Sequence, residues 1–321
     1  DNEWVIVATD RNGLRPLRYT VTRDKLLFAG SETGMIDLNE KKIVSKGRLG
    51  PGEILGVRIE KGKVYSNDEI KNYLSKEYKH YNNQIIDLDK KLEAETEKVE
   101  LEGQSLRNFQ HCFGYSIEDL ELILHPMAED AKEATGSMGD DTPLAVLSDK
   151  YRPLYHYFRQ NFSQVTNPPI DSLRENKVMS LKTRFGNLGN ILDFSKLTKD
   201  NIYVLNSPIL SNAQFEKFLK FFGNNNKVLD CTFSKDDDLE TSINLLKVKS
   251  EQAVREGIKQ IILSDKNISE NRMPMPMLLC IGAINTHLVK LGLRGYVSIN
   301  VQTGDALDTH SFATLIGVGA T

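Results

Sequence analysis

The sequence has few cysteines, and none of them are paired in a motif. Cys112, Cys231 and Cys280 are the three cysteines of the 321-residue chain, and their spacing forms no C-x-x-C element. This disfavours a structural zinc site, an iron–sulfur cluster and a disulfide framework. So sparse a use of thiols is typical of a reducing compartment, and we expect a cytoplasmic location.

Long apolar runs and an excess of charge of one sign are also missing. The longest apolar candidate, MLLCIGAI (277–284), is far shorter than the roughly 20 residues that span a bilayer. The 41 basic and 44 acidic residues are interspersed and leave a net charge of −3. The sequence therefore predicts neither a membrane nor a nucleic acid as partner.

A start signal is lacking as well. The chain opens on DNEWVIVATD, without Met and without a charged segment followed by an apolar one. This opening is typical of a strand, and it predicts that the chain is a piece of a longer polypeptide.

The first 67 residues contain six short β-like runs separated by glycine turns. The runs are EWVIVATD (3–10), LRYTVT (17–22), KLLFAGSE (25–32), KKIVSKG (41–47), EILGVRIE (53–60) and GKVYS (62–66). They predict an antiparallel sheet, with Asn12-Gly13 as a turn. Residues 88–104 are so charged that they predict a solvated linker or an exposed helix.

A helical block follows this charged segment. Ser116 and Asp119 resemble a capping box that opens a helix, and Pro126 predicts that this helix kinks or ends nearby. Two further helices are predicted at 151–162 and 173–185.

The last third alternates between strand and helix. Strands are predicted at 202–205, 227–233, 259–265, 295–302 and 310–320, and helices at 212–223, 239–257 and 275–292. This alternation predicts an α/β fold with parallel β-α units, either barrel-like or an open sheet, after a short antiparallel β segment.

The stretch ATGSMGDDTPLAVLSDKYRPL (134–154) is the most unusual in composition. It has neither the lysine of a P-loop nor the glycine spacing of a dinucleotide site, and its two carboxylates disfavour phosphate. Adjacent aspartates rarely bind one metal ion. We expect Asp140 or Asp141 to cap a helix that begins near Pro143. The small residues before them are typical of a backbone that approaches a ligand, a channel or another domain.

Other candidates for chemistry favour structural roles. His156 and His287 lie in amphipathic patterns, where packing or a satisfied hydrogen bond is the better interpretation. His111 and Cys112 are adjacent, so their side chains diverge. The glycines of LIGVGAT (315–321) are typical of a tight strand end, with a phosphate-binding turn as the less favoured alternative.

Three stretches, 9–57, 111–176 and 285–320, together resemble the glutamate synthase family. TDRNGLRPLRYTVTRDKLLFAGSETGMIDLNEKKIVSKGRLGPGEILGV (9–57) is similar to the end of a class II glutamine amidotransferase domain. HCFGYSIEDLELILHPMAEDAKEATGSMGDDTPLAVLSDKYRPLYHYFRQNFSQVTNPPIDSLREN (111–176) and NTHLVKLGLRGYVSINVQTGDALDTHSFATLIGVGA (285–320) are similar to the start and end of that family's central domain.

The resemblance implies an enzyme that makes L-glutamate from glutamine and 2-oxoglutarate, with FMN and an iron–sulfur cluster as cofactors. The amidotransferase cysteine, the FMN site and the cluster cysteines would all lie outside this chain, so no catalytic, cofactor or metal residue is assigned here. The implied partners are the amidotransferase and FMN domains of the same polypeptide, and an electron-donating small subunit or ferredoxin.

The resemblance also implies the role and the domain layout of the chain. Residues 1–80 would be the last strands of the amidotransferase domain, 81–105 a linker and 106–321 a central domain that joins two active sites and helps to form an ammonia tunnel. Because small neutral groups suit such a wall, the candidate residues are Gly136, Ser137, Met138, Thr142, Thr166 and Asn167. The alternatives are a flavin or phosphate-ligand enzyme of α/β-barrel type and a purely structural spacer.

Overall fold

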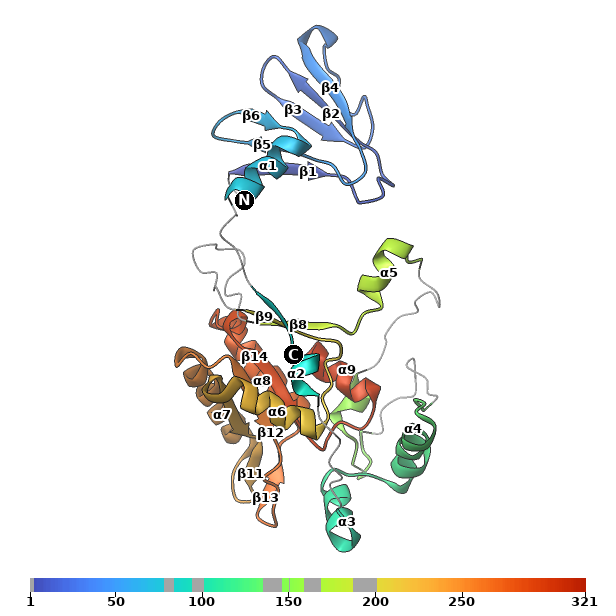
Figure 1. Ribbon diagram of the computed structural model, residues 1–321, viewed down its shortest axis with the longest axis vertical. Coiled ribbons are helices and arrows are strands. Elements are labelled where there is room, and N and C mark those ends of the chain that lie inside the picture. The colour runs from blue at the N-terminus through green and yellow to red at the C-terminus, as the bar shows by residue number, and fades with distance from the viewer. Residues whose placement is uncertain are drawn as a thin grey trace. The chain divides into compact units, whose positions relative to one another are not determined.

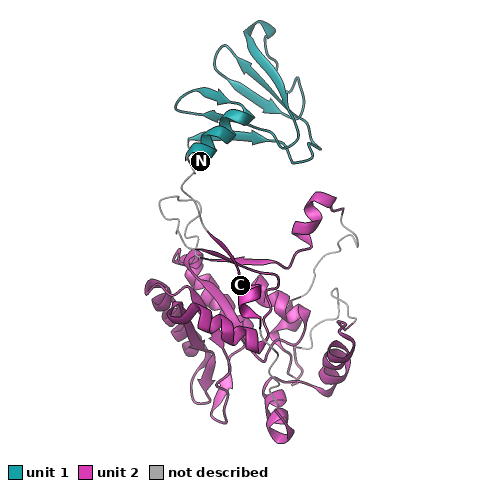
Figure 2. Ribbon diagram, in the orientation of Figure 1, with its two compact units in different colours: residues 1–82 teal, residues 83–321 magenta. Residues whose placement is uncertain are grey.

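The computed structural model describes residues 3–77, 84–93, 101–134, 146–149, 151–158, 169–186 and 201–321. The chain forms two compact units, Asp1–Asn82 and Asn83–Thr321, which Figure 2 shows in teal and magenta.

The first unit is antiparallel, as predicted, but it contains two sheets instead of one. Its six strands are β1 (Trp4–Ala8), β2 (Leu17–Thr22), β3 (Leu27–Gly30), β4 (Ile43–Leu49), β5 (Ile54–Arg58) and β6 (Lys63–Tyr65). They form the sheets β1-β5-β6 and β3-β2-β4. The helix α1 (Asn67–Glu77) packs on β5 through the buried Ile70, and Gly56 leaves the space for it. The Asn12-Gly13 turn is confirmed, with Gly13 at φ +62°.

A parallel sheet forms the core of the second unit, which confirms the predicted β-α alternation. Its order is β10 (Asn226–Asp230), β12 (Gln260–Ser264) and β14 (Ser298–Gln302). The helices α7 (Leu239–Arg255) and α8 (Met277–Lys290) connect these strands and pack against each other, so both cover the same face (Figure 1). All five residues of β12 are buried. Helices on one face of a parallel sheet are arranged as in a β/α barrel, although the described strands do not close into a barrel.

Part of the predicted linker, 81–105, is folded into a second sheet. In it, β9 (Ile202–Leu205) lies between β7 (Ile85–Asp87) and β8 (Thr183–Phe185). The short helix α2 (Asp89–Leu92) packs on α6 (Asn212–Phe222), whose capping box is formed by Ser211 and Gln214. Leu88 and Leu92 are fully buried in this cluster, so residues 84–93 are folded into the second unit.

The helical block follows the prediction at its start and departs from it later. α3 (Gly103–Cys112) is followed by a helix whose first turn is capped by Ser116 and Asp119 as predicted. This helix has a π-helical part, Asp119–Leu124, that leads into α4 (His125–Asp130). The His125 N–H donates to the carbonyl oxygen of Leu120, five residues earlier, just before Pro126, which has no N–H to donate. The helix ends on Ala131 at φ +51°.

Two predicted helices in the middle of the chain are shorter than expected. In the 151–162 prediction, the described part contains only a 3₁₀ turn at Leu154–Tyr157, which follows Pro153. In the range 173–185, which is predicted to be one helix, α5 (Ser172–Val178) ends early. The last three residues of the range form β8 instead. The strand pairs with β9, a contact far along the chain that local periodicity does not encode.

The predicted last strand, 310–320, is wrong. Residues Thr309–Gly317 form the helix α9, with Asp308 as its N-cap and Leu315 buried. Short apolar runs do not separate helix from strand by periodicity alone. Arg294 fixes the residues after this helix, because its guanidinium donates to Asn285 Oδ1 and to the carbonyl oxygens of Val297 and Gly319. The remaining named elements of this unit are β11 (Thr232–Ser234), paired with β13 (Arg272–Pro274), and 3₁₀ turns at Gly223–Asn225 and Arg294–Tyr296.

Candidate functional site

Polar residues follow two neighbouring strands of the parallel sheet at their carboxyl ends. Asp265 comes directly after β12, and Thr303, Gly304 and Asp305 come directly after β14. Parallel strands end at the same sheet edge, which is where ligand sites of open α/β sheets lie. Two carboxylates are therefore brought to one place from positions 40 residues apart in the chain.

Asp265 is buried and accepts two hydrogen bonds from the segment after β14. The Thr303 hydroxyl donates to its Oδ2, and the Gly304 N–H donates to its Oδ1 at 3.3 Å. The pKa of Asp265 is raised to about 6, chiefly by burial and also by the negative charge of Asp305, although the two hydrogen bonds oppose the rise.

The side chain of Asp305 lies beside the N-terminus of α8 and lines a cavity. Its Oδ2 accepts from the Met277 N–H at 3.4 Å and from the Tyr155 hydroxyl at 3.3 Å. Burial raises the pKa of Asp305, while these two donors favour the charged form. The carboxylate therefore interacts with the positive end of the α8 dipole as well as with a phenol.

Tyr115 binds the same segment from the side of the helical block. Its hydroxyl donates to the Gly304 carbonyl oxygen at 2.6 Å. Burial, together with the charges of Asp305 and Asp265, raises the pKa of Tyr115 to about 12, so the phenol stays a donor at neutral pH. Gly304 has to be glycine here, because a Cβ would lie 2.4 Å from the ring of Phe113.

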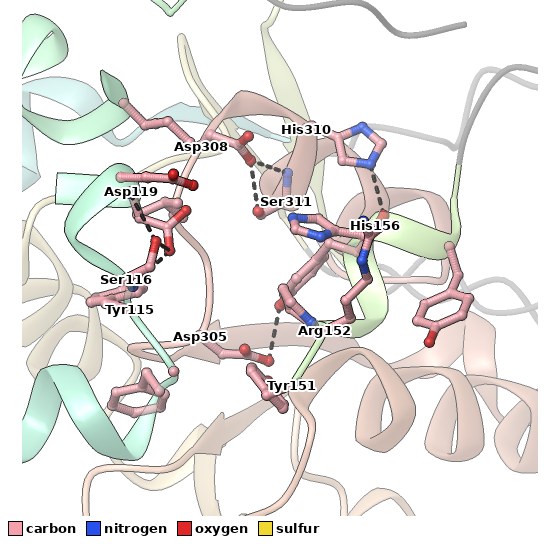
Figure 3. Close-up of a pocket in the computed structure, with 18 of the residues that line it drawn as sticks. Tyr115, Ser116, Asp119, Tyr151, Arg152, His156, Asp305, Asp308, His310 and Ser311 are labelled. Atoms are coloured by element: carbon pink, nitrogen blue, oxygen red, sulfur yellow. Dashed lines mark hydrogen bonds between the residues drawn. The ribbon is translucent and has the colours of Figure 1, made fainter. Parts of the chain in front are cut away.

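A cavity of about 480 Å³ opens between these elements (Figure 3). Its walls come from the turn at 113–116, the start of the π-helical segment, the 3₁₀ turn at 154–157 and the start of α9. Its polar and charged lining includes Tyr115, Ser116, Glu118, Asp119, Tyr151, Arg152, Tyr155, His156, Asp305, Asp308, His310 and Ser311. This volume is within the range of small-molecule sites.

The cavity is lined by charges of both signs. In Figure 3, Asp119 and Asp308 lie on one side, Arg152, His156 and His310 lie on the other, and Asp305 lies at the lower end of the view. Burial lowers the pKa of His156, as does the Arg152 charge, whereas Asp119 and Asp308 raise it. His310 Nε2 donates to the Tyr155 carbonyl oxygen at 2.9 Å, so this ring is held in place.

A second cavity, of about 820 Å³, shares one wall with the first. The shared residues are Phe113, Gly114, Tyr115, Tyr151 and Asp305. Gly114 has φ +72°, and a Cβ there would lie 2.5 Å from the ring of Tyr151. Close packing of a backbone and a ring thus separates the two cavities.

The six residues predicted to line an ammonia path lie outside the described residues. They are Gly136, Ser137, Met138, Thr142, Thr166 and Asn167, and the predicted helix cap at Asp140, Asp141 and Pro143 lies outside as well. Of the histidines, His287 has a satisfied hydrogen bond with Glu251 at 3.0 Å, as predicted. His156 lies instead on a 3₁₀ turn, where its partly exposed side chain lines the cavity.

Sequence reasoning missed the carboxylates and phenols of the site. A signal for both was present, because Asp265 is the last residue of the predicted strand 259–265 and Asp305 follows the predicted strand 295–302 by three residues. No local signal marks Tyr115 or Tyr155, whose partners lie 189 and 150 positions away.

The residues present do not fit a flavin phosphate or a metal cluster. The Asp308 carboxylate caps the N-terminus of α9, the place where a phosphate would bind. The phosphate alternative for LIGVGAT is wrong, because Leu315–Gly317 end a helix, whose carbonyl end repels anions. Over the described ranges, no three His, Cys, Asp or Glu side chains are placed to hold a metal ion. No helix in the described part of the chain is long and apolar enough to cross a membrane.

The fold and the site together define an α/β domain with a polar cavity at the carboxyl edge of a parallel sheet, preceded by an antiparallel β unit. The sequence of residues 108–321 matches the family model described as glutamate synthase central domain. Residues 1–83 match the model for class II glutamine amidotransferases. The chain therefore belongs to the glutamate synthase central-domain family.

Relatives match over the whole chain. The large chain of glutamate synthase [NADPH] from Azospirillum brasilense is 48% identical over 329 residues, and the alignment covers 100% of this chain and 22% of the relative. The corresponding large chain from Bacillus subtilis is 38% identical, with 100% and 21% covered. The chloroplastic ferredoxin-dependent glutamate synthase from Spinacia oleracea is 39% identical, with 100% and 20% covered. The chain thus spans about a fifth of the length of these relatives.

Proposed function

We propose that the chain acts as part of a glutamate synthase large chain, which makes L-glutamate from glutamine and 2-oxoglutarate. The observation that carries this proposal is similarity along the full chain to three such proteins, each about five times longer. Residues 1–80 are the last strands of the amidotransferase domain and 106–321 the central domain. The packing of Leu88 and Leu92 supports placing 84–93 with the central domain as well.

In this proposal the chain holds a glutaminase site and an FMN site at a fixed separation and forms part of the wall between them. Ammonia released at the first site would pass to the second without mixing with bulk water. Both sites and the cluster cysteines belong to other parts of the polypeptide. The names of the relatives include NADPH and ferredoxin as donors, and either one is compatible with this role.

The tunnel role is assigned to Gly136, Ser137, Met138, Thr142, Thr166 and Asn167. Small neutral side chains leave room for ammonia and neither protonate nor bind it. A bulky side chain at such a position would obstruct the path and leave the chemistry at both ends intact.

The test uses the full-length protein encoded by the native gene. M138W and T142W should leave glutamine hydrolysis active and lower the glutamate formed per glutamine hydrolysed several-fold, with free ammonia appearing in the medium. M179W is the matched control, because Met179 is 72% exposed at the end of α5. If both variants keep the wild-type ratio, the chain is a spacer without a tunnel role.

The stand-alone flavin enzyme is not favoured. It depended on a strand ending in glycines, and these residues form α9 and the turn after it. A full-length protein without glutaminase and glutamate synthase activity would contradict the family role itself, separately from the tunnel.

A further inference from the structure

We propose that the 480 Å³ cavity binds a small zwitterion, a free α-amino acid with a neutral side chain, between its acidic and basic walls. The inference stands on the cavity alone and does not depend on the ammonia path.

The acidic side of the cavity includes Asp119 and Asp308, each held by hydrogen bonds through one oxygen of its carboxylate. Asp308 uses Oδ1 to accept from the N–H and hydroxyl of Ser311, and Asp119 uses Oδ2 to accept from the N–H and hydroxyl of Ser116. Both side chains are thereby fixed. Among the described residues, no donor binds the other oxygen of either carboxylate, so each can accept from an ammonium group.

The basic wall has a guanidinium without an internal partner. Arg152 makes no hydrogen bond or ion pair with the described residues, although it lines the cavity and its charge acts on His156. A guanidinium binds a carboxylate through two parallel N–H donors. His156, on the same side of the cavity, provides one more polar group beside it.

The occupant has to carry both charges. Filling the cavity with an anion alone would place it opposite Asp119, Asp308 and Asp305, and filling it with a cation alone would place it opposite Arg152. An α-amino acid has its ammonium and carboxylate groups a few ångströms apart, and this pairing matches the two walls. Ile123 and Leu307 offer apolar surface for a neutral side chain.

The 321-residue chain can be tested directly with three matched probes by ligand-observed NMR. L-alanine should bind with a Kd of about 1 mM, which is typical of so small a ligand. Propanoate lacks the ammonium group and ethylamine lacks the carboxylate, so each should bind about tenfold or more weakly. Propanoate or ethylamine binding as tightly as L-alanine, or no L-alanine binding, overturns the proposal.

Two variants locate the binding. R152Q and D308N should each weaken L-alanine binding about tenfold or more, because each removes one charged partner. Asn caps helices nearly as well as Asp, so D308N retains α9. R107Q, on the exposed part of α3, is the control and should bind like the wild type. Circular dichroism confirms that each variant is folded, and unchanged affinity in folded R152Q and D308N refutes the site.

Discussion

Asp265 should make the second unit less stable as the pH rises. Its side chain is buried, and its pKa rises from the ordinary 3.8 to about 6 in the folded state. The folded state therefore binds this proton more tightly than the unfolded state. The resulting stability is fully present below about pH 4 and is lost as the pH passes through 6. At about 1.4 kcal/mol per pKa unit, the loss is about 3 kcal/mol.

The assay compares urea unfolding of the wild type and D265N between pH 4 and pH 8. The free energy of unfolding of the wild type should fall by about 3 kcal/mol relative to D265N over this range. Altered hydrogen bonds to Thr303 and Gly304 shift the D265N curve by a constant amount, so only the difference in slope matters. D236N, in the exposed turn after β11, should follow the wild-type slope. Parallel curves for the wild type and D265N would refute the reasoning.

Three further predictions concern packing and backbone, each measured by urea unfolding against the wild type. L88A should lower the free energy of unfolding by about 3 kcal/mol because Leu88 is fully buried. The same substitution in a solvated linker would lower it by less than about 0.5 kcal/mol. R294M should lower the free energy of unfolding by about 2–4 kcal/mol, since it leaves two carbonyl oxygens without donors. An unchanged free energy of unfolding would contradict the role of Arg294 in holding the residues after α9. G114A should cost more than G292A, because both glycines have positive φ but only at Gly114 would a Cβ meet a ring, that of Tyr151; equal costs would exclude the ring contact.

The elements of the last third could be predicted because each carries its own signal. The predicted strand 202–205 coincides with β9, and the predicted helix 212–223 extends one residue beyond α6. Buried parallel strands are continuous apolar runs, and the connecting helices have a separate period. The Ser116–Asp119 cap was predictable for the same reason, since all its partners lie within one turn.

The failures share a different cause. The charges of residues 88–104 dominate the average composition of that segment, whereas Leu88 and Leu92, four positions apart, anchor residues 88–92 by packing against α6. In 310–320, the apolar run was equally consistent with a strand, and the cap at Asp308 decides for a helix. Average composition therefore misleads where a few buried side chains provide most of the free energy.

The cavity was beyond sequence reasoning because its parts depend on one another. Asp305 is tolerable in a partly buried position only because the α8 N-terminus and Tyr155 donate to it, and Tyr155 is placed there by a 3₁₀ turn 150 positions earlier in the chain. Asp265 in turn needs donors from Thr303 and Gly304. Such an arrangement costs desolvation free energy that an apolar edge would avoid. An apolar edge could not present fixed charges to a ligand, and this is the physical reason for expecting the carboxyl edge of the sheet to bind one.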